Sequence, residues 1–119
     1  MADEITGKLT LNVSKGGAKI ARSESFSIDM TGDSFISGVQ GIPTTGEILV
    51  EADELGTAGY VYIKNLDSTN FVTVGNAAAS TNHIIKLKAG ECCLFRAFQP
   101  VYVDADTAAC NVEYIIIED

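Results

Sequence analysis

The chain is short of the residues that carry most enzyme chemistry. It has one histidine, His83, and no tryptophan among its 119 residues. A histidine general base needs a nucleophile within reach and a third group to orient it, and a zinc site needs several His or Cys ligands at short spacing. No C-x-x-C pair, calcium-loop pattern or phosphate-binding glycine loop occurs. We therefore expect no catalytic residue, no cofactor and no metal, and a protein that is not an enzyme.

Long hydrophobic runs and an excess of positive charge are also missing. No apolar stretch approaches the roughly 20 residues that a membrane-spanning helix needs. Met1-Ala2-Asp3-Glu4 opens with two acids, where a secretory signal would place lysines and then an apolar segment. Sixteen acids against eight bases give a formal charge of -8, which disfavours nucleic acid and anionic lipid as partners. We expect synthesis in a cytoplasm and no membrane partner.

Cysteine is scarce, with Cys92, Cys93 and Cys110 only. Neighbouring residues on a strand point to opposite faces, so Cys92 or Cys93 has the geometry to pair with Cys110 across adjacent strands. A cytosolic chain favours the other interpretation, in which all three are reduced and act as small buried hydrophobes. A thiol–imidazole pair with His83 is the catalytic alternative, and two packed thiols beside a surface imidazole are the structural one, which we favour.

What the chain does contain is a series of short segments rich in Val and Ile, separated by Gly, Asn, Asp and Pro. The strands that this pattern predicts span residues 8–13, 18–30, 46–51, 60–64, 71–74, 83–88, 91–98, 101–105 and 110–118. Residues 35–39 are a further candidate for a short strand, interrupted by Gly38. Turn signals every 8 to 12 residues or so are typical of an antiparallel sandwich. We predict an all-β fold, an antiparallel β-sandwich of about eight or nine strands with jelly-roll or Greek-key connections. It forms one domain over residues 1–119, with residues 1–7 as a candidate flexible arm.

Two segments carry specific expectations about burial. Leu9, Leu11 and Val13 alternate with polar residues, so they are predicted to face the core. Ile115-Ile116-Ile117 breaks the alternation, which indicates a strand that is apolar on both faces. Such a strand is either central in the domain or covered by another subunit, and we favour the central position.

The candidate interaction surface consists of aromatic and basic side chains. Tyr60 and Tyr62 share a strand face, which suits a sugar-stacking platform, a protein contact or a buried cross-strand pair. Lys86 and Lys88 also share a face, and Arg96 is expected near them across the Ala89-Gly90 turn. This basic spot suits an acidic edge of a neighbouring copy, and it is too small to indicate DNA binding.

The carboxylates suggest weaker alternatives. Asp104 and Asp106 share a strand face and, with Asp67, have the residue types of a calcium site. No calcium-loop pattern surrounds them, so ordinary turn positions are expected instead. The acidic stretch 104–119 suits docking on a basic partner, although a solvated strand face is the simpler interpretation.

Three segments of the second half, residues 59–75, 85–91 and 104–109, carry a resemblance. The stretches GYVYIKNLDSTNFVTVG, IKLKAGE and DADTAA resemble parts of small virion proteins of tailed bacteriophages. The likeness covers the chain from Gly59 to Glu118, about half of it. In that family these stretches build a β-sandwich, often jelly-roll-like, that sits on a capsid or tail and performs no catalysis.

The resemblance implies a structural protein of the virion. The leading expectation is a capsid decoration or cement protein that binds the major capsid shell and its own copies as a homo-oligomer, with head-fibre and tail positions as variants. The alternative is a carbohydrate- or receptor-binding module on the virion surface. An enzyme of cupin type is a third possibility, but such barrels usually bind metal through several histidines, and this chain has one.

Overall fold

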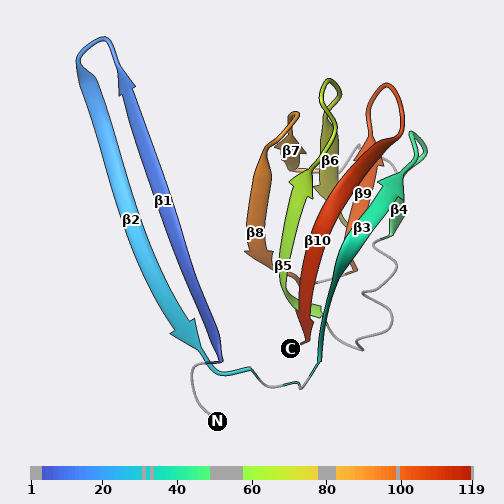
Figure 1. The fold of residues 1–119 in the computed structure, drawn as a ribbon, viewed down its shortest axis with the longest axis horizontal. Helices are drawn as coiled ribbons and strands as arrows, with labels where there is room; N and C mark the ends of the chain where they lie inside the picture. Colours follow the sequence, from blue (N-terminus) through green and yellow to red (C-terminus); the bar gives the residue numbers. More distant parts are fainter. Residues whose placement is uncertain are drawn as a thin grey trace. The chain divides into compact units, whose positions relative to one another are not determined.

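The computed structural model describes residues 4–30, 32, 34–48, 58–77, 83–98 and 100–118. The chain divides into two compact units, Met1–Thr31 and Gly32–Asp119. Every element in the described ranges is a β-strand, and all strand pairs are antiparallel (Figure 1). The prediction of an all-β antiparallel fold is confirmed.

The first unit is a long two-stranded hairpin. Strand β1 (Ile5–Lys15) pairs with β2 (Ala18–Ile28) in unbroken register, from Ile5 opposite Ile28 to Lys15 opposite Ala18. The connecting residues, Gly16 and Gly17, have φ angles of 60° and 86°. Only glycine adopts such values at no steric cost, and two consecutive positive φ angles match the twist of the flanking strands. The Gly-Gly dipeptide therefore fixes both the turn and the register.

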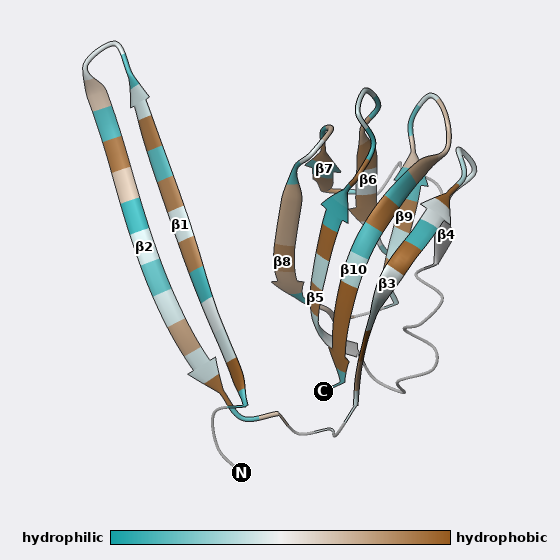
Figure 2. Cartoon of the chain, in the orientation of Figure 1, coloured by the Kyte–Doolittle hydropathy of each residue, from teal (hydrophilic) through white to brown (hydrophobic). Residues whose placement is uncertain are grey.

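The hairpin has one apolar and one polar face. Residues that are directly opposite in the register share a face, so the apolar side is formed by Ile5, Leu9, Leu11, Val13, Ile20, Phe26 and Ile28. The alternation is visible along both strands in Figure 2. The side chains of Leu11 and Ile20 are 59% and 64% exposed. We call this side the hairpin's apolar face.

Two sequence-based expectations are corrected by the hairpin. Leu9, Leu11 and Val13 are exposed rather than in the core, and β1 and β2 form a sheet of their own, so one sandwich over residues 1–119 is wrong. Alternation shows which side of a strand is apolar, but it does not show which sheet the strand joins. The candidate arm 1–7 also ends earlier, because β1 already begins at Ile5, and Met1 to Asp3 lie outside the described residues.

The second unit is the sandwich, built from two four-stranded sheets. The first sheet has the order β3 (Phe35–Ile42), β10 (Cys110–Glu118), β5 (Ala58–Asn65), β8 (Cys92–Arg96). The second sheet has the order β4 (Glu47–Ile48), β9 (Tyr102–Ala105), β6 (Val72–Gly75), β7 (Ile85–Leu87). The pairing is nested: β6 with β7, β5 with β8, β4 with β9 and β3 with β10. The sandwich prediction is therefore confirmed for this unit; the expected strand at 46–51 is described only to Ile48.

The core lies between the two sheets. The first sheet supplies Ile42, Val61, Ile63, Val112, Tyr114 and Ile116, and the second supplies Val72, Val74, Leu87, Val103 and Ala105. Strand β10 lies between β3 and β5, so the central position expected for 115–117 is correct. Ile116 is fully buried, whereas Ile115 points to the outside of the sheet and is partly exposed.

One polar residue belongs to this core. Asn65, at the end of β5, is fully buried. Its Nδ2 donates to the carbonyls of Asn70 (2.9 Å) and Leu87 (3.0 Å), and its Oδ1 accepts from the backbone N–H of Asp67 (2.9 Å). A buried amide is tolerated when its donors and acceptor are satisfied. Asn65 therefore ties the end of the first sheet to β7 of the second.

Candidate interaction surface

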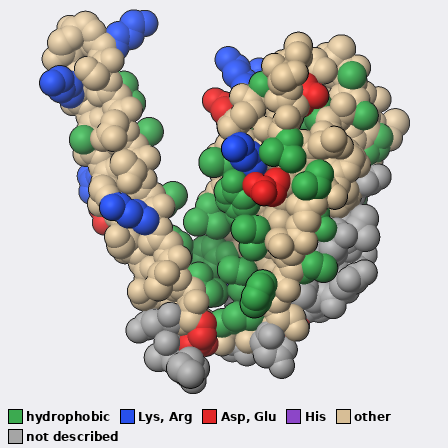
Figure 3. Space-filling model, in the orientation of Figure 1, with side chains coloured by type: hydrophobic (Ala, Val, Ile, Leu, Met, Phe, Trp, Pro, Cys, Tyr) green, Lys and Arg blue, Asp and Glu red, His purple; other side chains and the backbone are tan. Residues whose placement is uncertain are grey.

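The outward side of the first sheet is unusually apolar. Because side chains alternate along a strand, the residues between the core positions point away from the second sheet. The apolar members of this set are Phe35, Val39, Leu94, Ile115 and Ile117, with Tyr60 and Tyr62 beside them. Phe35 is 72% and Val39 60% exposed. We call this side the outer sheet face, and Figure 3 shows hydrophobic side chains gathered over it.

Three of the five residues proposed from the sequence lie together on this face. Tyr60 is opposite Arg96 in the β5–β8 register, and the guanidinium lies 4.7 Å from the centre of the Tyr60 ring, a cation–π contact. The Tyr62 hydroxyl donates to Glu113 Oε1 at 3.4 Å. Burial, followed by the neighbouring Cys92 and Glu113, raises the pKa of Tyr62 above its ordinary value. Contacts with Arg96 and Glu113 thus hold the two tyrosine side chains on a surface that has both apolar and charged residues.

The two lysines belong to another part of the sandwich. Lys86 is on β7 of the second sheet, and its ammonium lies 4.2 Å from the centre of the Phe71 ring. Lys88 follows β7, and its backbone N–H donates to Glu91 Oε1 at 2.7 Å. The Ala89-Gly90 turn joins strands of different sheets instead of closing a hairpin. Arg96 therefore faces Tyr60, and the expected cluster of Arg96 with the lysines is wrong.

The most exposed apolar residues of the outer sheet face, Phe35 and Val39, were not proposed from the sequence. The sequence does contain a signal for them, because segment 35–42 has apolar residues at odd-numbered and at even-numbered positions, and these point to opposite sides of the strand. Ile36 and Ile42 point inward, while Phe35 and Val39 point outward. It is the same pattern as at 115–117, on the neighbouring strand of the sheet. A strand that is apolar on both sides has a core on one side and an uncovered apolar surface on the other.

The imidazole of His83 is held in a structural hydrogen-bond pair. Its Nε2 lies 2.5 Å from the carbonyl oxygen of Ala77, which can only accept, so this nitrogen carries the proton. Its Nδ1, 2.8 Å from Thr73 Oγ1, then accepts from that hydroxyl. Both ring nitrogens are occupied, and the ring links β6 to the segment before β7. This arrangement leaves neither nitrogen available to activate a thiol.

The three cysteines are free thiols in different environments. Cys92 is exposed on the outer sheet face, Cys93 is partly buried on the inward side of β8, and Cys110 is buried. The expectation that all three are buried is therefore wrong for Cys92, because neighbours on a strand point to opposite sides. Burial raises the pKa of Cys93 to about 11 and also raises that of Cys110.

Asp67 and Asp106 occupy turns, as expected, whereas Asp104 lies on strand β9 opposite Thr73, so the expected turn position is wrong for Asp104. Asp67 Oδ2 accepts from the backbone N–H groups of Asn70 (2.6 Å) and Thr69 (2.9 Å), and these bonds lower the pKa of Asp67. Asp104 Oδ1 is buried and accepts no hydrogen bond within the described part of the chain. Among the residues that the structure describes, no group of three or more His, Cys, Asp or Glu side chains is placed to hold a metal ion.

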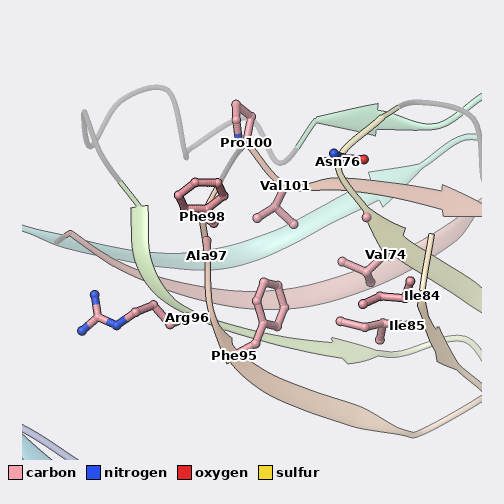
Figure 4. Close-up of a pocket in the computed structure, with 11 residues that line it drawn as sticks. Val74, Asn76, Ile84, Ile85, Phe95, Arg96, Ala97, Phe98, Pro100 and Val101 are labelled. Carbon is pink, nitrogen blue, oxygen red and sulfur yellow. The ribbon is translucent and has the colours of Figure 1, made fainter. Parts of the chain in front are cut away.

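A small apolar cavity of about 300 Å³ opens at one side of the sandwich, where β8 and β7 form the edges of their sheets. Figure 4 shows Val74, Ile85 and Phe95 directed toward its interior, while the Arg96 side chain extends away. Ile84 and Phe98 beside it are 92% and 96% exposed. The lining is apolar enough to receive a hydrophobic side chain and is at the lower size limit for small-molecule pockets.

Comparison of the chain with protein-family models, with curated proteins and with solved structures gave no match. A search of the described residues for a helix with the length and hydropathy to cross a membrane found none.

Proposed function

We propose that this protein is a non-catalytic structural component of a tailed-phage virion, a decoration or cement protein that attaches to the major capsid shell and to its own copies. The observation that carries the proposal is the outer sheet face, on which Phe35 and Val39 expose most of their surface. Contiguous apolar patches on a soluble protein mark interaction sites. The resemblance of residues 59–75, 85–91 and 104–109 to virion proteins supplies the class of partner.

Two further features support the proposal. The nested pairing of the eight sandwich strands is the order expected of a jelly roll, the form that the resemblance implies. Repetition on a shell also suits a protein with modest individual contacts, because many weak attachments add through multivalency. The mechanism is passive: apolar side chains of the outer sheet face lose contact with water when a neighbouring copy or the shell covers them.

The test is binding of the purified protein to purified particles from which it has been stripped or deleted, followed by co-sedimentation. The proposal expects saturable binding, reduced at least tenfold in affinity by Phe35→Asp on the outer sheet face and unchanged by Ser68→Asp in the exposed 65–70 turn. Absence of saturable binding by the folded wild-type protein would contradict it.

A glycan-binding function is the second candidate, because Tyr60 and Tyr62 share the outer sheet face with Arg96. Aromatic faces beside polar groups are suited to stacking on sugar rings. A glycan array probed with wild-type protein and with Tyr60→Ala tests this alternative. Binding that is lost in the variant would favour it, and an array without signal would reject it.

A further inference from the structure

The two-stranded hairpin leaves its apolar face exposed to water within its own unit. An isolated two-stranded hairpin is at best marginally stable in water. Here eleven residues per strand pair, and no other strand in the described part of the chain joins this sheet. Its apolar face carries seven large hydrophobic side chains, and Leu11 and Ile20 among them are more than half exposed. A covering surface would stabilise both the hairpin and the orientation of these side chains.

We propose that the hairpin's apolar face binds the outer sheet face of a second copy of this chain, reciprocally, so that two copies exchange their hairpins. This proposal specifies how copies of the protein bind each other. It rests on the proposed function only for the assumption that the dimer is part of a virion. Each copy carries both halves of the contact, so the dimer is closed by a twofold axis.

The area of the proposed contact reaches that of a stable dimer. At the rise of a β-strand, the eleven residues of each hairpin strand span about 36 Å, while the nine residues of β10, the longest strand of the outer sheet face, span about 30 Å. A hairpin about 10 Å wide laid along that strand would remove roughly 600 Å² of surface from water, counting both partners. Reciprocal exchange doubles this to roughly 1,200 Å², the lower end of the usual range of about 1,200–2,000 Å² for stable protein interfaces. A single contact would fall below that range.

The charges also favour this pairing. The hairpin strands Ile5–Lys15 and Ala18–Ile28 carry four bases and one acid, a net charge of +3, while the acids Glu4 and Asp29 lie at their base. Residues 32–119 carry four bases and twelve acids, a net charge of -8. The first unit as a whole, residues 1–31, is neutral with four bases and four acids, so it is the positive strands that are attracted to the acidic sandwich of another copy.

Single charged groups within the two surfaces are matched as well. The hairpin's apolar face contains one ion pair, with Arg22 Nη1 3.1 Å from Glu24 Oε2. The outer sheet face contains Lys64 opposite Glu113 in the β5–β10 register. The hairpin's apolar face thus carries Lys15, Arg22 and Glu24. The outer sheet face carries Lys64, Arg96 and Glu113, so each surface holds an acid and bases that can pair with the other. Charges that become covered can be paired across the contact, which a uniformly apolar partner would not permit.

The short connection between the two units favours exchange over closure within one chain. Only six residues, 29–34, separate the end of β2 at Ile28 from the start of β3 at Phe35. Short links between an element and its domain promote exchange between copies, because folding the element back requires a tight reversal. A second copy supplies the same surface without that reversal.

The experiment uses two full-length variants, each defective in one half of the contact. Leu11→Asp places a charge in the hairpin's apolar face and leaves the sandwich intact; Val39→Asp does the converse. Molar mass is measured by size-exclusion chromatography with light scattering, under reducing conditions, for each variant and for their equimolar mixture. Controls are Thr10→Asp on the polar face of the hairpin and Ser68→Asp in the sandwich. Far-ultraviolet circular dichroism confirms folding, and Val13→Ser and Ile115→Ser replace any variant that fails to fold.

The expected result is a wild-type mass of twice 12.6 kDa, retained by both controls. Each variant alone is a monomer at least tenfold above the wild-type dissociation concentration. Raised to higher concentration, the mixture recovers a weaker dimer through the one intact contact, whereas neither variant alone does. A monomeric wild type, or a mixture that stays monomeric, overturns the proposal in favour of closure within one chain or a different partner. Dimeric Val39→Asp overturns it in favour of hairpin–hairpin contact. Particle binding is measured separately, so failure of the virion assignment would leave these masses unchanged.

Discussion

Asn65 shows how one polar side chain can organise a core that is otherwise apolar. The amide satisfies two carbonyls and one backbone N–H from separate segments. Its own backbone N–H donates to the Glu91 carbonyl (2.9 Å) and its carbonyl accepts from Gly90 N–H (3.0 Å). Through this residue the 65–70 turn, β7 and the turn before β8 are held in one arrangement. The sequence suggests a turn at Asn65 but gives no sign that its side chain is buried.

Replacement of Asn65 by alanine should therefore be costly. The substitution removes the Asn65 partner of one buried carbonyl, that of Leu87, and of two partly buried backbone groups, and it opens a cavity. We therefore expect a loss of about 3 kcal/mol in the free energy of unfolding. Urea denaturation followed by circular dichroism measures it. The matched control is Asn111→Ala, an exposed asparagine on β10, for which the change should stay within about 0.5 kcal/mol. Equal effects of the two substitutions would refute this role.

Asp67 makes the stability of the same turn dependent on pH. Hydrogen bonds from the backbone N–H groups of Asn70 and Thr69 lower its pKa in the folded state below the ordinary value of 3.8. Because the pKa of Asp67 is lower in the folded than in the unfolded state, its ionised carboxylate stabilises the protein fully at pH values above the unfolded-state pKa. This stabilisation is lost as the pH falls through the folded-state pKa. The difference in stability between wild type and Asp67→Ala should shrink when the pH is lowered from 7 to 3. A difference that grows on acidification, measured by urea denaturation, would contradict the assignment.

At the scale of the elements, β8 illustrates how strand alternation sets side-chain chemistry. Cys92 points to the exposed outer sheet face and Cys93 to the core side, where burial raises its pKa to about 11. The thiolate is the reactive form, so a buried thiol with a raised pKa is slow to react. Of the two adjacent cysteines, Cys92 is exposed, while Cys93 is shielded and its raised pKa keeps it protonated at neutral pH.

Labelling with iodoacetamide at pH 8 should separate these two thiols. In the native protein Cys92 should react at least about 100-fold faster than Cys93, because only about one in a thousand Cys93 thiols is ionised at this pH and the side chain is also shielded. Cys110 should be protected as well, since it is buried. Peptide mass spectrometry gives the rates, with protein in urea as the control in which all three react. Similar native rates for Cys92 and Cys93 would disprove the orientation of β8.

The elements also show what the sequence can and cannot predict. Strand β10 is predicted with its observed bounds, since the inward residues Cys110, Val112, Tyr114 and Ile116 recur at every second position. The hairpin strands are predicted over residues 8–13 and 18–30 and observed over Ile5–Lys15 and Ala18–Ile28. They are assigned to the wrong sheet, because alternation carries no information on the partner sheet. The predicted position of Arg96 beside the lysines is wrong for a related reason. Ala89-Gly90 has the composition of a tight hairpin turn, but it connects strands of different sheets. The local sequence pattern thus predicts which segments are strands and which of their sides is apolar. Which residues meet on one surface depends on the pairing of strands far apart in the sequence.

At the scale of the molecule, apolar surface and charge are distributed unevenly. The hairpin strands carry half of the chain's eight Lys and Arg residues, and the sandwich unit carries twelve of its sixteen acids. An apolar surface lies on the hairpin and another on the outer sheet face. Such a distribution is unfavourable for a protein that stays alone in water, and it suits one that is covered on both surfaces in an assembly.

The account therefore depends on the protein being a repeated part of a larger particle. Under the proposed virion function, quantitative mass spectrometry of particles purified from a lysate that contains the chain, with isotope-labelled peptides from residues 59–75 and from the major capsid protein, tests this most directly. The account predicts many copies per particle, at a fixed ratio to the capsid protein that persists through repeated gradient purification. Detection of the chain in the lysate of infected cells, but not in the purified particles, would contradict it.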